Sequence, residues 1–141
     1  MTAVITIIIF TISFFVITIH AQSLQPGIWK VKSDIKLNGI SLPTESVEDC
    51  ITVAEAKDAK TTVAKELKRN ECLIKSWKIK GQNLTAKISC ASREIQADGI
   101  LTGQFTKKSY ILSGNATGTY QNLIPSVAHL KLEGVWISAC K

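Results

Sequence analysis

Residues 27–39 read GIWKVKSDIKLNG, an alternation of apolar and charged side chains that ends in a turn dipeptide. Most residues of one parity between Trp29 and Leu37 are apolar, whereas three lysines and an aspartate occupy the other parity. Successive side chains of a strand point to opposite faces, so this pattern predicts a strand with one buried face. Asn38-Gly39 predicts a hairpin turn after it, because both residues accept a positive φ.

The same period of two recurs along the rest of the chain. Pro43, which cannot donate a backbone hydrogen bond, predicts a break after the first hairpin. A second hairpin is expected around residues 81–83, a third with arms at 94–106 and 109–120, and a last strand over 127–137. We therefore expect a mainly β (α+β) fold of about seven antiparallel strands, in a curved sheet or partial barrel with one inserted helix.

The inserted helix is expected over residues 52–69. Thr52 and Glu55 have the spacing of a capping box, in which each side chain satisfies an unpaired amide of the first turn. Acidic residues lie near its start and basic residues at its end, the order that the helix dipole favours. Its apolar stripe is narrow, which predicts a helix resting on the rim of the sheet.

The first residues resemble an export signal. No charged side chain occurs in residues 1–19, and residues 3–19 form a nearly unbroken apolar run that ends in Ile19-His20-Ala21. This pattern predicts a signal peptide over residues 1–21, cleaved after Ala21, which leaves a single domain over residues 22–141. The alternative is a retained membrane anchor through residues 3–19.

Four cysteines form an even set in a chain expected to be exported, which predicts two disulfides and a periplasmic or secreted location. Among the three pairings, we favour Cys50–Cys72, because these residues bracket the helix, and Cys90–Cys140, because strand parity directs both into one core. Their spacing is too wide for a cysteine-rich metal site, so we expect neither a metal nor another cofactor.

The charge of the chain is +6, from 17 basic and 11 acidic residues. Such a charge favours an anionic surface as partner. The lysines are scattered along strand-like segments, however, and no recognition helix or stacking motif accompanies them. We therefore expect a solvated surface and no binding of nucleic acid.

Several segments together resemble domain of unknown function family 3617. They are residues 26–29 (PGIW), residues 50–52 (CIT), Cys72 and Cys90 around a hairpin, and residues 134–140 (GVWISAC). Ser138 departs from the glycine that is common there. Members of that family are small exported bacterial proteins, so the resemblance implies a periplasmic or secreted protein and supplies no activity.

The predicted domain carries little that would support catalysis. His129 is its one histidine and lies on the polar parity of its strand, which favours a surface position. Sequence motifs of serine hydrolases, zinc proteases and phosphate-binding loops are absent. We therefore predict no catalytic residue and no enzyme, with a hydrolase using acidic residues as the less favoured alternative.

Four glycines lie on predicted strands, namely Gly99, Gly103, Gly114 and Gly118. Glycine in a strand indicates either sharp curvature or a close approach to the backbone, so these residues mark a candidate ligand groove. Two hypotheses follow. The chain is an exported non-catalytic module that binds a protein or an envelope component through a sheet edge or basic face, or it carries a small apolar ligand.

Overall fold

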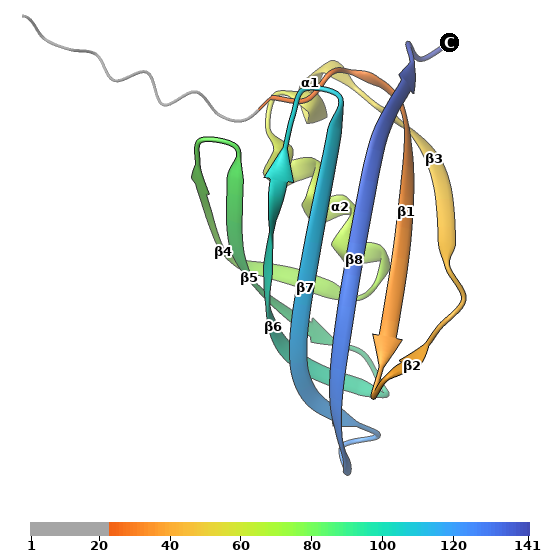
Figure 1. The fold of residues 1–141 in the computed structure, drawn as a ribbon, viewed down its shortest axis with the longest axis vertical. Helices are drawn as coiled ribbons and strands as arrows, with labels where there is room; N and C mark the ends of the chain where they lie inside the picture. Colours follow the sequence, from red (N-terminus) through yellow and green to blue (C-terminus); the bar gives the residue numbers. More distant parts are fainter. Residues whose placement is uncertain (1–22) are drawn as a thin grey trace, which may run out of the picture.

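The computed structural model describes residues 23–141, which form eight strands and two helices (Figure 1). The predicted signal peptide and its cleavage site after Ala21 lie outside the described residues. The strands are β1 (Gly27–Leu37), β2 (Ile40–Ser41), β3 (Glu45–Ile51), β4 (Cys72–Lys80), β5 (Asn83–Ala91), β6 (Ile95–Phe105), β7 (Ser109–Tyr120) and β8 (Ile124–Ser138). The helices α1 (Val53–Ala56) and α2 (Ala59–Arg69) lie between β3 and β4 in the chain.

All strands belong to one antiparallel sheet, in the order β2-β1-β8-β7-β6-β5-β4. β3 also pairs with β1, along the edge that β2 extends. The sheet curves around α2, and its edge strands β3 and β4 do not pair with each other (Figure 1). The expectation of a mainly β fold with about seven strands in a curved sheet is confirmed.

β1 has the bounds and the alternation that its sequence predicts. Trp29 and Val31 are buried, whereas Lys30 and Lys32 are exposed on the convex face. The following turn uses the two expected residues, since Asn38 and Gly39 have φ values of 50° and 83°. The chain then passes through a short break that contains Pro43 before it re-forms a strand.

The predicted helix over residues 52–69 is two helices. The capping box at its start is present, because Thr52 and Glu55 exchange the expected hydrogen bonds. The first helix stops after one turn, where the Asp58 carboxylate accepts a hydrogen bond from Lys60 N at 3.0 Å and caps a new helix. Aspartate competes for backbone donors in this way, which explains why the single long helix is wrong.

α2 does not rest on the rim of the sheet. Its residues Ala59, Val63 and Leu67 are at most 1% exposed and belong to the main apolar cluster. The sheet wraps around the helix, so even a narrow apolar stripe becomes fully covered (Figure 1). The rim position inferred from the narrow stripe is therefore wrong.

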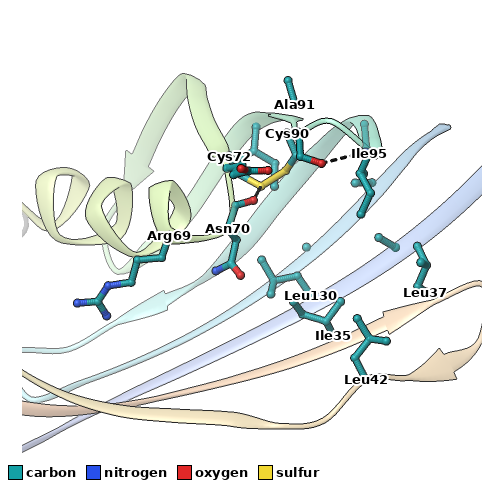
Figure 2. Close-up of a pocket in the computed structure, with 17 residues that line it drawn as sticks. Ile35, Leu37, Leu42, Arg69, Asn70, Cys72, Cys90, Ala91, Ile95 and Leu130 are labelled. Carbon is teal, nitrogen blue, oxygen red and sulfur yellow. Dashed lines mark hydrogen bonds between the residues drawn. A yellow bond between two sulfur atoms is a disulfide. The ribbon is translucent and has the colours of Figure 1, made fainter. Parts of the chain in front are cut away.

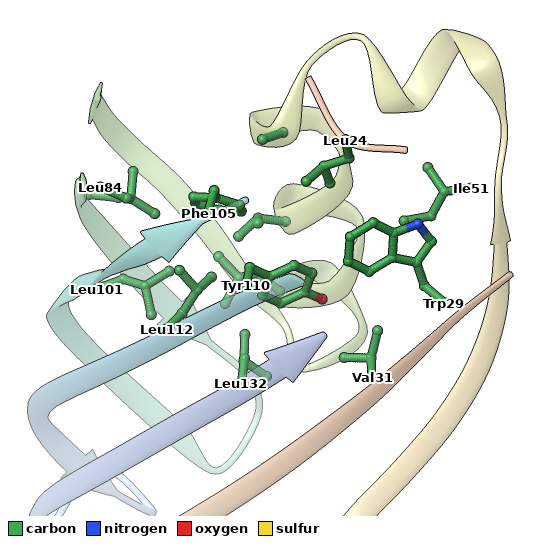
Figure 3. Packing of buried hydrophobic residues seen from close by; sticks show 14 of the residues in the cluster. Leu24, Trp29, Val31, Ile51, Leu84, Leu101, Phe105, Tyr110, Leu112 and Leu132 are labelled. Carbon is green, nitrogen blue, oxygen red and sulfur yellow. The ribbon is translucent and has the colours of Figure 1, made fainter. Parts of the chain in front are cut away.

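The largest side chains of the core lie at the end of the sheet that α2 covers (Figure 3). The rings of Trp29 and Tyr110 stack with centroids 5.8 Å apart, and Phe105 lies 5.6 Å from Tyr110. Trp77 and Trp136 are half-buried and pack against this cluster. Such aromatic pairs add to the stabilisation that apolar burial provides.

The predicted disulfide pairing, Cys50–Cys72 with Cys90–Cys140, is wrong. The bonds join Cys50 to Cys140 and Cys72 to Cys90. Cys72 and Cys90 lie directly opposite each other on β4 and β5. A register shift after Ile74 creates this pairing, because the register near the turn would place Cys72 opposite the residue after Cys90.

A second register shift explains the error at Cys140. Trp29 pairs with Trp136, whereas Ile28 pairs with Ser138, so β8 contains one extra residue near its end. Extrapolating the inward parity of Trp136 to Cys140 ignored this residue, which reverses the parity beyond it. The end of the chain instead reaches β3, which carries the partner cysteine.

Two disulfides indicate an oxidising environment outside the cytoplasm. Over residues 23–141, neither helix has the length and apolar character needed to cross a membrane.

Candidate functional site: an apolar cavity on the concave face

The candidate site begins where α2 ends. The chain leaves the helix at Asn70, turns at Glu71 with a φ of 56°, and enters β4 at Cys72. Beyond this turn, neither helix of residues 23–141 covers the concave face. A cavity of about 340 Å³ lies there, between the end of α2 and the inner faces of the strands (Figure 2).

The cavity stays open because the side chains beneath it are small. Ala97, Gly114, Ala116 and Ala128 point inward from β6, β7 and β8, and Ala116 pairs directly with Ala128. Their methyl groups and the hydrogen of Gly114 are too small to fill the space on the concave face of the curved sheet. Three of these residues were not identified from the sequence, although small residues on the inward parity of neighbouring strands were a usable signal.

The walls of the cavity are mainly apolar. Figure 2 shows Ile35, Leu37, Leu42 and Leu130 on one side and the Cys72–Cys90 disulfide on the other. Further lining residues are Ile88, Ala91 and Ile95. Such a surface offers dispersion contacts and burial to an apolar molecule.

Three polar side chains of the lining already have partners within the protein. Asn70 Nδ2 donates to the carbonyl of Glu66 at 3.4 Å, and Ser92 Oγ accepts from Ile95 N at 2.9 Å. The Arg69 guanidinium forms two ion pairs of 2.9 Å with carboxylates. These groups therefore do not require a polar ligand to satisfy them.

The four glycines of the candidate groove fall into two sets. Gly114 lines the cavity. A Cβ at Gly99 would lie 2.5 Å from the Asn115 carbonyl oxygen, and one at Gly103 or Gly118 would overlap the backbone of the adjacent strand. These three glycines therefore allow close, curved packing of β6 against β7, and Gly114 is the member of the set at the cavity.

A more polar hollow of about 560 Å³ adjoins the cavity and shares four lining residues with it. His129 lies there, is exposed as expected, and has its Nδ1 2.5 Å from Asn115 Oδ1. Other polar lining residues are Asp34, Lys36, Thr44 and Lys131. The strand residues among these polar residues share the parity of Lys30 and Lys32, so they face the convex side of the sheet, opposite the apolar cavity.

A cluster of charged residues fixes α2 to the sheet. Asp49 of β3 pairs with Lys65 and Arg69 of α2 at 2.9 Å each, while Lys65 also reaches Glu55 and Arg69 reaches Glu66. The hydrogen bond from Lys65 lowers the pKa of Asp49, whereas burial raises the pKa of Glu66. Each charged side chain of this cluster has at least one partner of opposite charge, which fits a structural role. Within residues 23–141, no group of three metal-ligating side chains is gathered at one place.

Comparisons with known proteins identify one family. The model for the proteins of unknown function DUF3617 matches residues 24–140, nearly all of the described chain. No curated protein and no solved structure matches significantly. The resemblance inferred from the sequence motifs is confirmed.

Proposed function

This chain belongs to the DUF3617 family of proteins of unknown function, and we propose that it is an exported, non-catalytic protein that carries a small apolar ligand. The apolar cavity beyond the end of α2 carries this proposal. Its volume of about 340 Å³ is in the range of small-molecule sites. Apolar walls that remain in contact with water are unfavourable, and a ligand would remove that contact.

The other hypothesis, binding of a protein or envelope component at a sheet edge, receives less support. The free edge of β4 carries Lys75, Lys78 and Lys80 and contains a register shift. Charged side chains and bulges on an edge strand oppose the addition of another strand. The cavity therefore favours the carrier over the edge-binding module.

Export is part of the proposal. Two disulfides favour an oxidising compartment, and the apolar run over residues 3–19 resembles a signal peptide. We propose a periplasmic or secreted protein that begins at Gln22. The intact mass of the protein from its own host tests this start. A mass equal to that of residues 22–141 would support it, whereas a mass that includes Met1 would favour the retained anchor.

Ligand binding is tested with the fluorescent apolar probe N-phenyl-1-naphthylamine. Ala128→Trp places a large ring in the cavity, so we expect it to weaken probe binding by about tenfold or more. Val135→Trp is the matched control, because this exposed residue of the same strand points to the convex face. Native mass spectrometry of the protein from its own host would show whether a small molecule accompanies it.

Two results would contradict the carrier. The first is a wild-type protein that neither binds the probe nor carries a small molecule from its host. The second is probe binding that Ala128→Trp leaves unchanged, since the probe would then bind elsewhere.

A further inference from the structure

Three turns bound the end of the molecule at which the cavity lies. The β1–β2 turn contacts β8 through two hydrogen bonds, from Asn38 N to Val127 O and from Val127 N to Asn38 Oδ1, both 2.8 Å. The β5–β6 turn contacts the β7–β8 turn through Gln121 N and Glu94 O at 2.6 Å. Figure 1 shows the β7–β8 hairpin extending farthest at this end, below β2.

These turns carry large apolar side chains that face water. Leu123 is 83% exposed and Ile40 is 70% exposed, and Ile124 and Val127 are exposed beside them in the chain. A single exposed leucine would be ordinary. Here the four lie at one end of the sheet, in β2, the β7–β8 turn and the start of β8, and Ile40 pairs with the cavity residue Leu37. An apolar patch at the mouth of a binding site indicates an interaction surface.

Positive charge accompanies the patch. Lys36 precedes the β1–β2 turn and Arg93 lies in the β5–β6 turn, and both are exposed. Glu94 beside Arg93 accepts a hydrogen bond from the neutral Tyr120 hydroxyl, so the formal charge of Lys36, Arg93 and Glu94 together is +1. The whole chain also carries +6. Apolar side chains flanked by cations are suited to the headgroup region of an anionic bilayer.

We propose that these turns dock the protein on an anionic lipid bilayer, with the cavity mouth facing the lipid. The inference rests on the proposed function, because it gives an apolar ligand a route between membrane and cavity without crossing water. The apolar side chains would enter the interface, and Lys36 and Arg93 would meet the anionic headgroups.

Co-sedimentation with vesicles tests the docking surface. We expect the wild-type protein to bind phosphatidylglycerol vesicles, more weakly at high salt, and to bind pure phosphatidylcholine vesicles less. The double variant Ile40→Ser/Leu123→Ser should lower the partition coefficient roughly tenfold or more, because it removes apolar surface from the interface. Ile100→Ser/Ile111→Ser is the matched control, since these residues are 52% and 54% exposed on the convex face.

A second variant keeps the proposal testable if the first one folds poorly. Lys36→Glu/Arg93→Glu should weaken binding to anionic vesicles by about tenfold or more, because each substitution replaces an attractive charge with a repulsive one. Thermal unfolding of each variant would check that its fold is retained.

Three outcomes would overturn the docking surface. They are unchanged vesicle binding in both turn variants, an equal loss in the convex-face control, and a wild-type dimer that Ile40→Ser/Leu123→Ser dissociates. The last would assign the patch to a second copy of the chain. The carrier is judged separately, because the turn variants should keep their affinity for the probe while Ala128→Trp should keep its affinity for vesicles.

Discussion

At the scale of single residues, Gly103 and Gly114 lie on neighbouring strands and face the same concave side, yet they meet different surroundings. A Cβ at Gly103 would overlap the carbonyl oxygen of Ile111 and lie 2.8 Å from the Cα of Leu112. A Cβ at Gly114 would meet the side chain of Leu101 at 3.3 Å, a contact that a small rotation can relieve. Gly103 is therefore needed for the close approach of β7, whereas the space around Gly114 can accept a methyl group.

We predict that Gly103→Ala lowers the free energy of unfolding by about 1–3 kcal/mol, because the backbone of β7 must move away. Gly114→Ala should cost less than about 1 kcal/mol, since alanine also restricts the unfolded chain. Urea unfolding of both variants measures the difference. Equal costs would mean that the close approach at Gly103 does not constrain the sheet.

The residues of the site were only partly accessible from the sequence. Of the four strand glycines of the candidate groove, only Gly114 lines the cavity. Parity alone could not separate it from Gly103, because both face inward and differ only in what the neighbouring strand brings close. The alanines of the cavity share the inward parity of their strands, but that parity points to a cavity only once the end of α2 is located.

At the scale of elements, the sequence predicted local structure correctly where a few neighbouring residues determine a turn or a helix cap. Asn38-Gly39 forms the predicted turn, and Thr52 with Glu55 forms the predicted cap. The break at Asp58 was missed because an aspartate early in a helix also fits the helix dipole. Register shifts in β4 and β8 were missed for a different reason, since a bulge depends on the partner strand.

The attachment of α2 to β3 should depend on pH through Asp49. Folding lowers the pKa of this carboxyl below its ordinary value of 3.8, chiefly through the hydrogen bond from Lys65. A carboxyl with a lowered pKa stabilises the folded state above its ordinary pKa, and this contribution is lost as the pH falls through the folded value. The ionised form is thus the one that holds the helix.

We expect Asp49→Asn to lower the free energy of unfolding at pH 7 by about 0.5–1 kcal/mol, a small value because the partly exposed ion pairs are screened by water. The difference from the wild-type protein should shrink below the ordinary carboxyl pKa and vanish once the folded carboxyl is protonated. Urea midpoints measured from pH 7 down to the acid limit of folding would show this. Glu48→Gln on the same strand is the control, and a difference that persists in acid would argue against the ionic attachment.

At the scale of the whole molecule, the order of strands decides which cysteines meet. Cys50, Cys72 and Cys90 lie in strands and Cys140 lies just after β8, and parity was used to pair Cys90 with Cys140. In the sheet, however, β6 and β7 separate β5 from β8. β1 instead pairs with both β3 and β8, which brings Cys50 close to the end of the chain. This long-range order is not encoded in any local pattern, so the pairing could not follow from the sequence.

The two disulfides should therefore differ in their effect on stability. Cys50–Cys140 spans 90 residues and Cys72–Cys90 spans 18. In the loop-entropy model, their removal costs about 4–5 and about 3 kcal/mol respectively, because the longer loop restricts the unfolded chain more. Urea unfolding of Cys50→Ser/Cys140→Ser and Cys72→Ser/Cys90→Ser should show this order. Non-reducing peptide mapping of the wild-type protein must first recover the two linked pairs, and a Cys50–Cys72 peptide would contradict the strand order from which the prediction is drawn.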